Sequence, residues 1–471
     1  MIYFVCRAAG RPGPEMKICL INPPWVTKSN NIWTKIRGTL PPLGLLYLAA
    51  FLEREGVTAD IIDCQAGLRS WEEVRSRLKQ GRYDLYGITG TTSIISNSYR
   101  LAAMVKDCHP DAKVVMGGVH VTALPEEALG KSAVDFVIRG EGENALLELA
   151  KGAAPDAIAG LSYRAGGKIV HNGESCIMPD LDALPFPAFH KVNMKAYFPA
   201  LNSYKRLPAI NMMTTRGCPG RCTFCNSASV PLRRRSAENI FGEMKMLSGK
   251  YGIKEISFYD DTFTVFHDNI TKLCDMLIAG GVDLTWSCFA RVDTVTLPLL
   301  KKMKAAGCHQ VMFGIESASP EILKNIRKNV QLEKNREAVQ MAKDAGITVR
   351  CTFMFGNPGE TERTIDETIK YSLELDPDIA LYNITTPYPG TEMFGWAKEA
   401  GYLLSENWDD YDLSEPVMRL PTISPEKLQL KYKEAFRAFY FRPRKIFKKI
   451  ADMVTLKDVH TLPDVIRRIF S

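Results

Sequence analysis

The stretch TTRGCPGRCTFCNSASV, residues 214–230, places Cys218, Cys222 and Cys225 within eight residues of one another. It follows the apolar run AINMMTTRG, which is a strand candidate. Three thiols on the loop after a buried strand indicate a ligand site. The kind of site depends on how many further ligands the chain offers nearby.

A structural zinc site needs four ligands, usually arranged as two pairs. Here the cysteines are spaced three and then two residues apart, and the nearest downstream candidates, His267 and Cys274, are far along the chain. Three thiolates on one loop suit three irons of a four-iron cluster, whose last iron stays open for an external ligand. The pattern therefore favours an iron–sulfur cluster over zinc.

Six strand candidates alternate with helical stretches around this loop. They are AINMMTTRG (209–217), EISFYDD (255–261), LTWSCFAR (284–291), QVMFGIES (310–317), TVRCTFMFG (348–356) and IALYNITTPYP (379–389). Six strand–helix units predict a partial (β/α)6 TIM-type barrel with its active site at the strand ends. The cysteine loop follows the first of these strands.

A second α/β unit is predicted before the barrel. Its strand candidates are KICLINPP (17–24), TADIIDC (58–64), DLYGITG (84–90), KVVMGGV (113–119) and VDFVIRG (134–140). Helical stretches separate them, and strict alternation predicts a doubly wound, Rossmann-like parallel sheet. In such sheets ligands bind outside the carboxyl ends of the strands.

The proline-rich stretch MPDLDALPFPAFHKV (178–192) marks the boundary between the two units, because prolines at this density resist helix and sheet. We divide the chain into an N-terminal extension, a Rossmann-like domain, a linker, a barrel and a helical basic C-terminal segment. Their residues are 1–15, 16–178, 179–206, 207–402 and 403–471.

The run KYKEAFRAFYFRPRKIFKKI, residues 431–450, contains eight Lys or Arg and one acid, interleaved with Phe and Tyr. A basic amphipathic stretch can make peripheral contact with a membrane or bind acidic ligands. The favoured alternative is a capping helix that packs through its aromatics and keeps its charges in water.

The composition excludes several classes of protein. Hydrophobic residues make up 46% of the 471 and charged residues 24%, and no apolar run approaches the roughly 18 residues of a membrane span. The first residues, MIYFVCRAAGRPGPE, lack the features of a secretory signal, so the 12 cysteines indicate a reducing cytoplasm. A net charge of +7 is modest for this length and does not call for nucleic acid.

The motif CPGRCTFC, with Phe224 before the last cysteine, resembles the CxxxCxxC signature of the radical S-adenosylmethionine superfamily. The resemblance implies a catalytic 4Fe-4S cluster on Cys218, Cys222 and Cys225, with S-adenosylmethionine on the open iron. Reduction then cleaves the sulfonium to methionine and a 5′-deoxyadenosyl radical. Phe224 is expected beside the adenine.

Further motifs at the predicted strand ends resemble the same superfamily. FYDDTF suggests Asp260 and Asp261 for the amino group of S-adenosylmethionine, CFARVD suggests Arg291 for its carboxylate, and FGIES suggests Glu316 for the ribose or amino acid moiety. Charged groups at strand ends are costly to bury without a polar ligand. The alternative for Arg291 and Glu316 is a structural ion pair.

A doubly wound domain joined to such a barrel resembles the cobalamin-binding subclass, through PPLGLLYLAAFLEREG (41–56) and GGVHVTALPEEAL (117–129). The resemblance implies corrin or nucleotide-tail contacts at Gly117, Gly118, His120 and Ser93. Plain packing or cobalt ligation are alternatives for His120. The Asp-x-His-x-x-Gly motif is absent, so cobalt is not expected to be held by that histidine.

Three hypotheses follow from the resemblance. In the leading one, the enzyme methylates an unactivated carbon of a small-molecule or lipid-like substrate, using methylcobalamin and an electron donor such as flavodoxin or ferredoxin. In the second, the substrate radical is oxidised, cyclised or coupled without methyl transfer, as in the anaerobic cyclase of bacteriochlorophyll synthesis. In the third, the cobalamin site is vestigial or serves a sensor.

Overall fold

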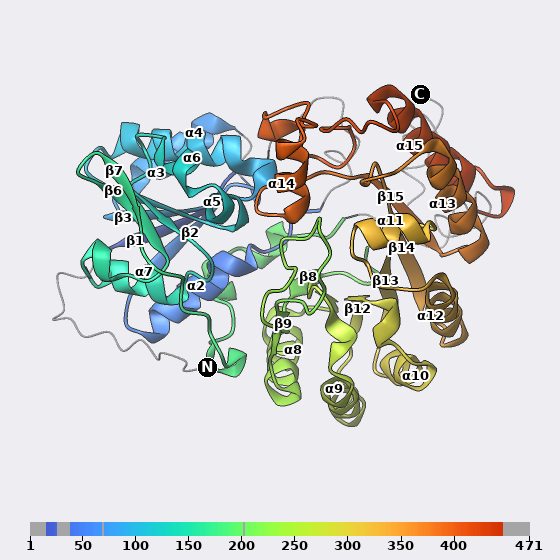
Figure 1. Ribbon diagram of the computed structural model, residues 1–471. Coiled ribbons are helices and arrows are strands. Elements are labelled where there is room, and N and C mark those ends of the chain that lie inside the picture. Colours follow the sequence, from blue (N-terminus) through green and yellow to red (C-terminus); the bar gives the residue numbers. More distant parts are fainter. Residues whose placement is uncertain (1–15, 26–37, 68–69, 201–202, 446–471) are drawn as a thin grey trace.

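The computed structural model describes residues 16–25, 38–67, 70–200 and 203–445. It contains two sheets with helices packed on them, side by side in Figure 1. The predicted N-terminal extension and the last residues of the basic C-terminal run lie outside the described residues.

The first sheet confirms the predicted parallel strands and adds two antiparallel ones at its edge. The strand order is β2-β1-β3-β4-β5-β6-β7. The parallel strands are β1 (Ile18–Asn22), β2 (Ala59–Asp63), β3 (Leu85–Thr89), β4 (Lys113–Gly117) and β5 (Phe136–Ile138). The added hairpin is β6 (Leu161–Ala165) and β7 (Lys168–His171). Its turn, Gly166 and Gly167, has φ values of 56° and 77°, which suit a two-residue hairpin loop.

Helices cover both faces of this sheet, as a doubly wound fold requires (Figure 1). The helices are α2 (Leu43–Arg54), α3 (Trp71–Gln80), α4 (Ile95–Cys108), α5 (Val119–Ala123), α6 (Pro125–Leu129) and α7 (Glu143–Ala150). Side chains of α2 and α7 form one hydrophobic core with the sheet, and those of α3 and α4 form the other. Every residue of β1 is buried, because both faces of the strand are covered.

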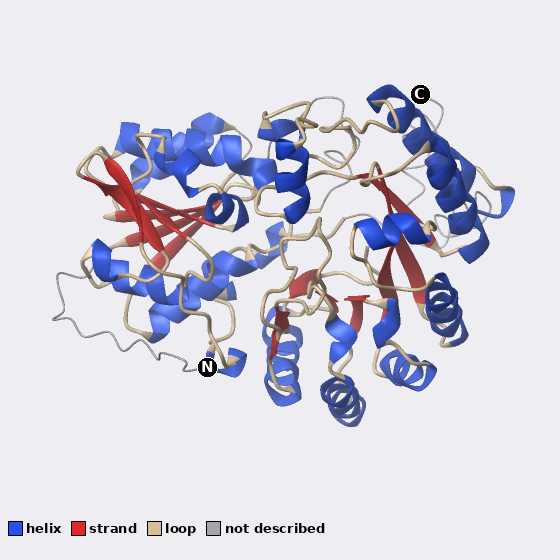
Figure 2. Cartoon of the chain, viewed as in Figure 1, coloured by secondary structure: helices blue, strands red, loops and turns tan. Residues whose placement is uncertain are grey.

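The second sheet confirms all six predicted barrel strands. They lie parallel in the order β15-β14-β13-β12-β11-β8 and curve into the open barrel that Figure 2 shows. The strands are β8 (Ala209–Met212), β11 (Glu255–Phe258), β12 (Thr285–Ala290), β13 (Cys308–Glu316), β14 (Thr348–Phe355) and β15 (Ile379–Ile384).

Helices line the outer face of the barrel (Figure 1). They are α8 (Ala237–Tyr251), α9 (His267–Ala279), α10 (Leu297–Ala305), α12 (Leu332–Asp344) and α13 (Glu362–Leu375). The short helices α11 (Pro320–Asn325) and α14 (Glu392–Glu399) follow the carboxyl ends of β13 and β15, and α15 (Pro425–Tyr440) comes after them in the chain. In β14, Cys351 and Phe353 are fully buried against this outer layer, whereas Arg350 and Thr352 point inward and stay partly exposed. The concave face of the barrel is therefore accessible to solvent.

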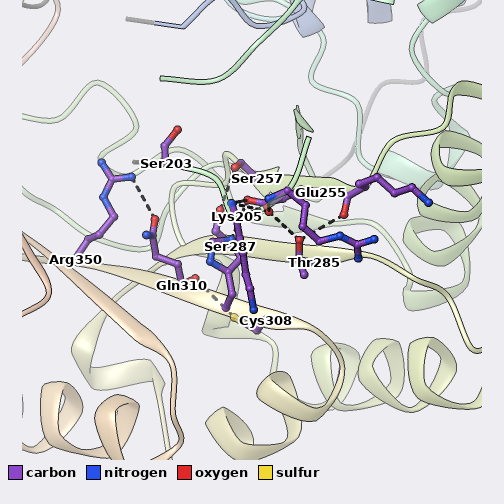
Figure 3. Close-up of polar contacts among 12 residues, drawn as sticks. Ser203, Lys205, Glu255, Ser257, Thr285, Ser287, Cys308, Gln310 and Arg350 are labelled. Carbon is purple, nitrogen blue, oxygen red and sulfur yellow. Dashed lines mark hydrogen bonds and ion pairs between the residues drawn. The ribbon is translucent and has the colours of Figure 1, made fainter. Parts of the chain in front are cut away.

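The predicted linker packs into both domains. Leu181 belongs to a core of the first domain and Phe189 to the barrel core. The linker then passes the start of β11, where the backbone N–H groups of Lys205 and Arg206 donate to the buried Glu255 carboxylate. Figure 3 shows Lys205 beside Glu255. These hydrogen bonds hold the linker at the amino-terminal end of the barrel.

Helix α15 caps the open edge of the barrel. Phe436 and Phe439 pack edge-on against Tyr382 of β15. Basic side chains near the helix pair with barrel acids, such as Arg442 with Asp376 at 2.7 Å. Up to residue 445 the basic run is thus a capping helix, the favoured alternative, while residues 446–450 lie outside the described residues. Among the described helices, none combines the length and apolar character needed to cross a bilayer.

The buried Arg235 connects the two domains. Arg235, 4% exposed, lies 2.5 Å from the Glu243 carboxylate of α8 and donates to the Tyr47 hydroxyl of α2. Burial raises the pKa of Glu243, and the neighbouring guanidinium opposes that rise. The carboxylate depends on this one cation for compensation.

We predict that Arg235→Ala lowers the free energy of unfolding by about 3–5 kcal/mol, because it leaves Glu243 buried without a counter-ion. Urea unfolding measures the change. The matched control is Arg234→Ala, which removes a neighbouring arginine whose partner Asp268 is on the surface. The control should unfold close to the wild type, and equal effects of the two substitutions would contradict the assignment.

Candidate functional site

The cysteine loop begins where Asp260 fixes the end of β8. The Asp260 carboxylate accepts hydrogen bonds from the backbone N–H of Thr214 at 2.6 Å and of Thr215 at 2.7 Å, and from the Thr214 hydroxyl at 2.5 Å. Burial raises its pKa to about 6, and these hydrogen bonds oppose the rise. The group is therefore ionised at neutral pH and can accept all three bonds.

A two-stranded neck closes the loop. Strand β9 (Thr215–Arg216) pairs antiparallel with β10 (Arg233–Arg234). Gly217 has φ of 88°, and a Cβ there would lie 2.4 Å from the Pro231 carbonyl oxygen, so only glycine fits. The Cys218 N–H then donates to the Val230 carbonyl at 3.2 Å. Both ends of the loop are held in place by backbone contacts.

The three cysteines are free, half-buried thiols. Burial raises the pKa of Cys222 and of Cys225, and the charges of neighbouring cysteines raise both further, which places the three sulfurs within electrostatic range of one another. The loop is tied to the barrel helices by Thr223, whose N–H donates to Ile326 and whose carbonyl accepts from the Met393 N–H.

Within the described ranges, no three His, Cys, Asp or Glu side chains converge on a point where one metal ion could bind. In an iron–sulfur cluster each thiolate binds its own iron, so the sulfurs need not converge. Three free thiols on one fixed loop fit a 4Fe-4S cluster.

Of the two predicted aspartates, Asp261 lies beside the cysteines, where it accepts from the Ser227 hydroxyl at 2.9 Å. Asp260 is buried and holds the strand end instead. Phe224 packs partly against the barrel core. The contacts predicted between these three residues and S-adenosylmethionine remain predictions.

Arg291 and Glu316 both lie near the cysteines and both have ion-pair partners. Arg291 donates two hydrogen bonds to Asp293, at 3.0 and 2.8 Å. Glu316 accepts from Lys328 at 3.0 Å. The charges of Arg291, Glu316 and Lys328 all act on the pKa of Cys222. Arg291 and Glu316 therefore do form the ion pairs that were given as the alternative to binding S-adenosylmethionine. Because both residues also lie beside the cysteine loop, their predicted contacts with S-adenosylmethionine stay predictions.

Glu316 has an unusual backbone conformation. Its φ is 68°, and the register between β13 and β14 shifts at this residue. Non-glycine residues in this region cluster at ligand sites, where the surrounding structure holds them. Lys328, its partner, was not predicted from sequence, because its position depends on the loop after α11 and no local pattern marks it.

A cavity of about 420 Å³ lies at the carboxyl ends of the first sheet. It opens between β1 and β3, where the strand order reverses direction and ligands of such folds bind. The residues that line it include Asn22, Thr91, Gly117, Gly118, Glu141 and Arg216. A Cβ on Gly117 would touch only the Ile138 carbonyl oxygen, at 3.9 Å, so this position faces free space.

The structure brings Gly117 and Gly118 to the cavity but not His120 or Ser93. His120 is fully buried beside the cavity, with Nδ1 3.1 Å from the Thr92 hydroxyl and its ring against Trp408. These contacts match plain packing, one of the alternatives to a cobalamin contact that were given for His120. A cradle of glycines and apolar side chains at the strand ends fits the corrin or the nucleotide tail of cobalamin.

Arg216 connects the cavity to the cysteine loop. It lines the cavity and precedes Cys218 by two residues. Its guanidinium lies 3.2 Å from Glu141 and 2.6 Å from Glu143, both in the first domain. Arg233, its partner across the neck, lies 2.5 Å from Glu141. The cavity and the loop thus share one ion-pair network.

Comparisons with known proteins agree with this architecture. Residues 212–372 match the family model of the radical SAM superfamily, and residues 31–150 match that of the B12 binding domain. The chain is 36% identical to an uncharacterised methyltransferase of Pyrococcus horikoshii over 92% of this chain and 95% of the relative. It is 27% identical to the anaerobic magnesium-protoporphyrin IX monomethyl ester cyclase of Rubrivivax gelatinosus, over 86% of this chain and 75% of the relative.

Two solved structures share the fold. OxsB, a cobalamin-dependent S-adenosylmethionine radical enzyme solved with aqua-cobalamin and S-adenosylmethionine, covers 95% of this chain and 72% of its own, with a TM-score of 0.75 and 17% identity. The methyltransferase TsrM from Kitasatospora setae, solved with cobalamin and a [4Fe-4S] cluster, covers 82% of this chain and 75% of its own, with a TM-score of 0.66 and 19% identity. The matched family models and the Pyrococcus relative show that this chain belongs to the radical SAM superfamily, as a member whose barrel follows a B12-binding domain.

Proposed function

We propose that the protein is a cobalamin-dependent methyltransferase that uses radical chemistry to methylate an unactivated carbon of a small molecule. The observation that carries the proposal is the network around Arg216, which joins the cavity of the first domain to the loop of the three cysteines. An enzyme that uses two cofactors on one carbon must hold both at a fixed separation.

When bound, the cluster and S-adenosylmethionine supply the 5′-deoxyadenosyl radical, and cobalamin supplies a methyl carrier. The chain's residues would hold these groups. Cys218, Cys222 and Cys225 would bind the cluster, and Gly117 and Gly118 leave room for cobalamin.

The relatives favour methyl transfer. The Pyrococcus relative, similar over 92% of the chain, is described as a methyltransferase, and a cytidylyl-2-hydroxyethylphosphonate methyltransferase of Streptomyces wedmorensis is 28% identical over 84% of the chain. The similarity to the anaerobic cyclase keeps oxidative cyclisation or coupling as the second candidate. An open cavity beside the barrel favours a functional cobalamin site over a vestigial one.

The proposal includes a reductant, because the radical reaction consumes one electron. A flavodoxin or ferredoxin in the cytoplasm is the class of protein we expect to supply it. Membrane contact through the basic C-terminal run stays a prediction for residues 446–450. Basic side chains of residues 431–445 are less available for membrane contact, since Lys431 pairs with Asp366 and Arg442 with Asp376.

We predict that anaerobically reconstituted protein, reduced and given S-adenosylmethionine labelled in its methyl group, forms 5′-deoxyadenosine and passes label to its bound cobalamin. Cys222→Ala should fall to the background level of 5′-deoxyadenosine, because one cluster ligand is missing. The control is Cys108→Ala, which removes a half-buried thiol from α4 and should retain about four irons per chain.

Two outcomes would count against this account. Wild-type iron content and 5′-deoxyadenosine in Cys222→Ala would reject the cluster assignment. Formation of 5′-deoxyadenosine without label on cobalamin would favour cyclisation or coupling over methyl transfer.

We predict that Gly117→Leu abolishes cobalamin binding without unfolding the chain, because the new side chain would extend into the cavity and meet little protein. Corrin absorbance after gel filtration measures retention. The control is Gly249→Leu, on the exposed side of α8, where an added side chain meets nothing within 4 Å. Equal cobalamin retention in both variants would show that the cofactor binds elsewhere.

A further inference from the structure

The inner face of the barrel carries a layer of polar side chains, whereas closed eight-stranded barrels fill this space mainly with Val, Ile and Leu. The layer, here called the polar belt, is formed by one residue from each of five neighbouring strands. They are Asn211, Ser257, Ser287, Gln310 and Arg350. Figure 3 shows Ser257, Ser287, Gln310 and Arg350, which come from the neighbouring strands β11, β12, β13 and β14.

Strand register places Asn211, Ser257, Ser287 and Gln310 at one depth, and Arg350 two residues nearer the carboxyl ends of the strands, level with Met312. Ser257 is the register partner of both Asn211 and Ser287, and Ser287 is the partner of Gln310. The Ser257 and Ser287 hydroxyl oxygens are 3.0 Å apart. Arg350 donates to the Gln310 side-chain oxygen at 3.3 Å, which leaves the NH₂ of Gln310 as a donor.

The space above the belt is open toward the cysteine loop. Two residues further along the same face of β11, Tyr259 is 47% exposed. Phe289 and Met312, on the same face of β12 and β13, are partly exposed. Side chains on the outer face, such as Phe313, are fully buried. A ligand entering from the cysteine loop would therefore first meet the layer that contains Phe289 and Met312, with Arg350 at the same level, and then the other belt residues below it.

Arg350 has no carboxylate partner among the described residues. Of the cations nearer the cysteines, Arg291 pairs with Asp293 and Lys328 with Glu316. No Asp or Glu of the described chain lies within 4 Å of the Arg350 guanidinium, and its buried Nε makes no hydrogen bond there. Burial lowers the pKa of Arg350, and only the phenols of Tyr259 and Tyr440 oppose this. A cation that has lost much of its contact with water and lacks a counter-ion is costly.

The Glu255 carboxylate, which lies below the belt, already accepts hydrogen bonds from other groups. Glu255, two residues before Ser257, accepts from the N–H groups of Lys205 and Arg206, from the Thr285 hydroxyl and from a ring nitrogen of His309. It is fully buried, and the linker covers it. Glu255 therefore already has its hydrogen-bond partners and is not the counter-ion of Arg350.

We propose that the polar belt binds an oxyanion of the substrate, a carboxylate or a phosphate, with Arg350 as its cation and Gln310 and the serines as hydrogen-bond partners. The inference rests on the proposed function, since it assumes that the barrel holds the substrate. Met312, the register partner of Arg350, lies four residues before Glu316 on β13, about 13 Å along the strand. The substrate is thus elongated, with its anion at the far end from the reacting carbon and an apolar portion between them.

The experiment measures thermal unfolding of the reconstituted full chain with matched probe pairs. The pairs are 4-phenylbutyrate with 4-phenylbutyramide, and 3-phenylpropyl phosphate with 3-phenylpropanol. A ligand that binds only the folded state raises the melting temperature. We expect the anion of at least one pair to raise the melting temperature more than its neutral partner, and the pair that responds more strongly identifies carboxylate or phosphate.

Variants link the effect to Arg350. Arg350→Met should unfold at an equal or higher temperature without probe, because it removes an uncompensated charge, and should lose the response to the anion. Calorimetric titration should show at least about tenfold weaker anion binding, the usual loss when a charged hydrogen bond is removed. Arg350→Lys should retain part of the response, and the lumen control Met312→Leu all of it.

Three results would overturn the inference: no preference for either anion over its neutral partner, an undiminished response in Arg350→Met, or a lower melting temperature of that variant without probe. The test does not depend on the cluster, so Cys222→Ala should keep the anion response. A protein that forms 5′-deoxyadenosine but shows no anion preference would refute the belt alone. One that shows the preference without radical chemistry would refute the proposed function alone.

Discussion

The ion pairs of Arg216 with Glu141 and Glu143 are the contact on which the architecture of the site depends. Their side chains are 14%, 17% and 6% exposed, so the charges are largely removed from water. Removing charges from water is unfavourable unless partners are well placed, which makes such pairs sensitive to geometry. The network therefore favours one arrangement of the cysteine loop against the cofactor cavity.

Two further arginines on the same short segment extend this constraint. Arg233 bonds to Glu141, and Arg235 connects Tyr47 of the first domain to Glu243 of the barrel. Both arginines lie just after the cysteine loop, as Arg216 lies just before it. The segment that would hold the cluster is thus clamped to the first domain from both sides, and it is also fixed to the barrel by Asp260.

Sequence reasoning predicted the two α/β units, all six barrel strands and the cysteine loop, because hydrophobic runs and ligand spacing are local signals. It missed the β6–β7 hairpin, although Gly166 and Gly167 give a turn signal between two short runs. It could not separate the roles of Asp260 and Asp261. These neighbours point to different sides of the strand end, one buried and one toward Ser227.

Long-range pairs were also beyond prediction. Lys328 meets Glu316 only because the loop after α11 returns to the barrel, and His120 lies under Trp408, which is 288 residues further along the chain. That Arg350 has no carboxylate partner among the described residues is likewise a property of its surroundings. Nothing in TVRCTFMFG indicates that the arginine lacks an acid, since its potential partners come from other strands.

Buried ion pairs are proposed to hold the cobalamin cavity and the cluster loop at one separation. Pulsed electron paramagnetic resonance between cob(II)alamin and the reduced cluster measures this separation directly. We expect one narrow distribution of the distance between cob(II)alamin and the cluster in the wild type, and a broader one in Arg216→Gln. A broad or multiple distribution in the wild type, or an unchanged narrow one in Arg216→Gln, would contradict the proposal.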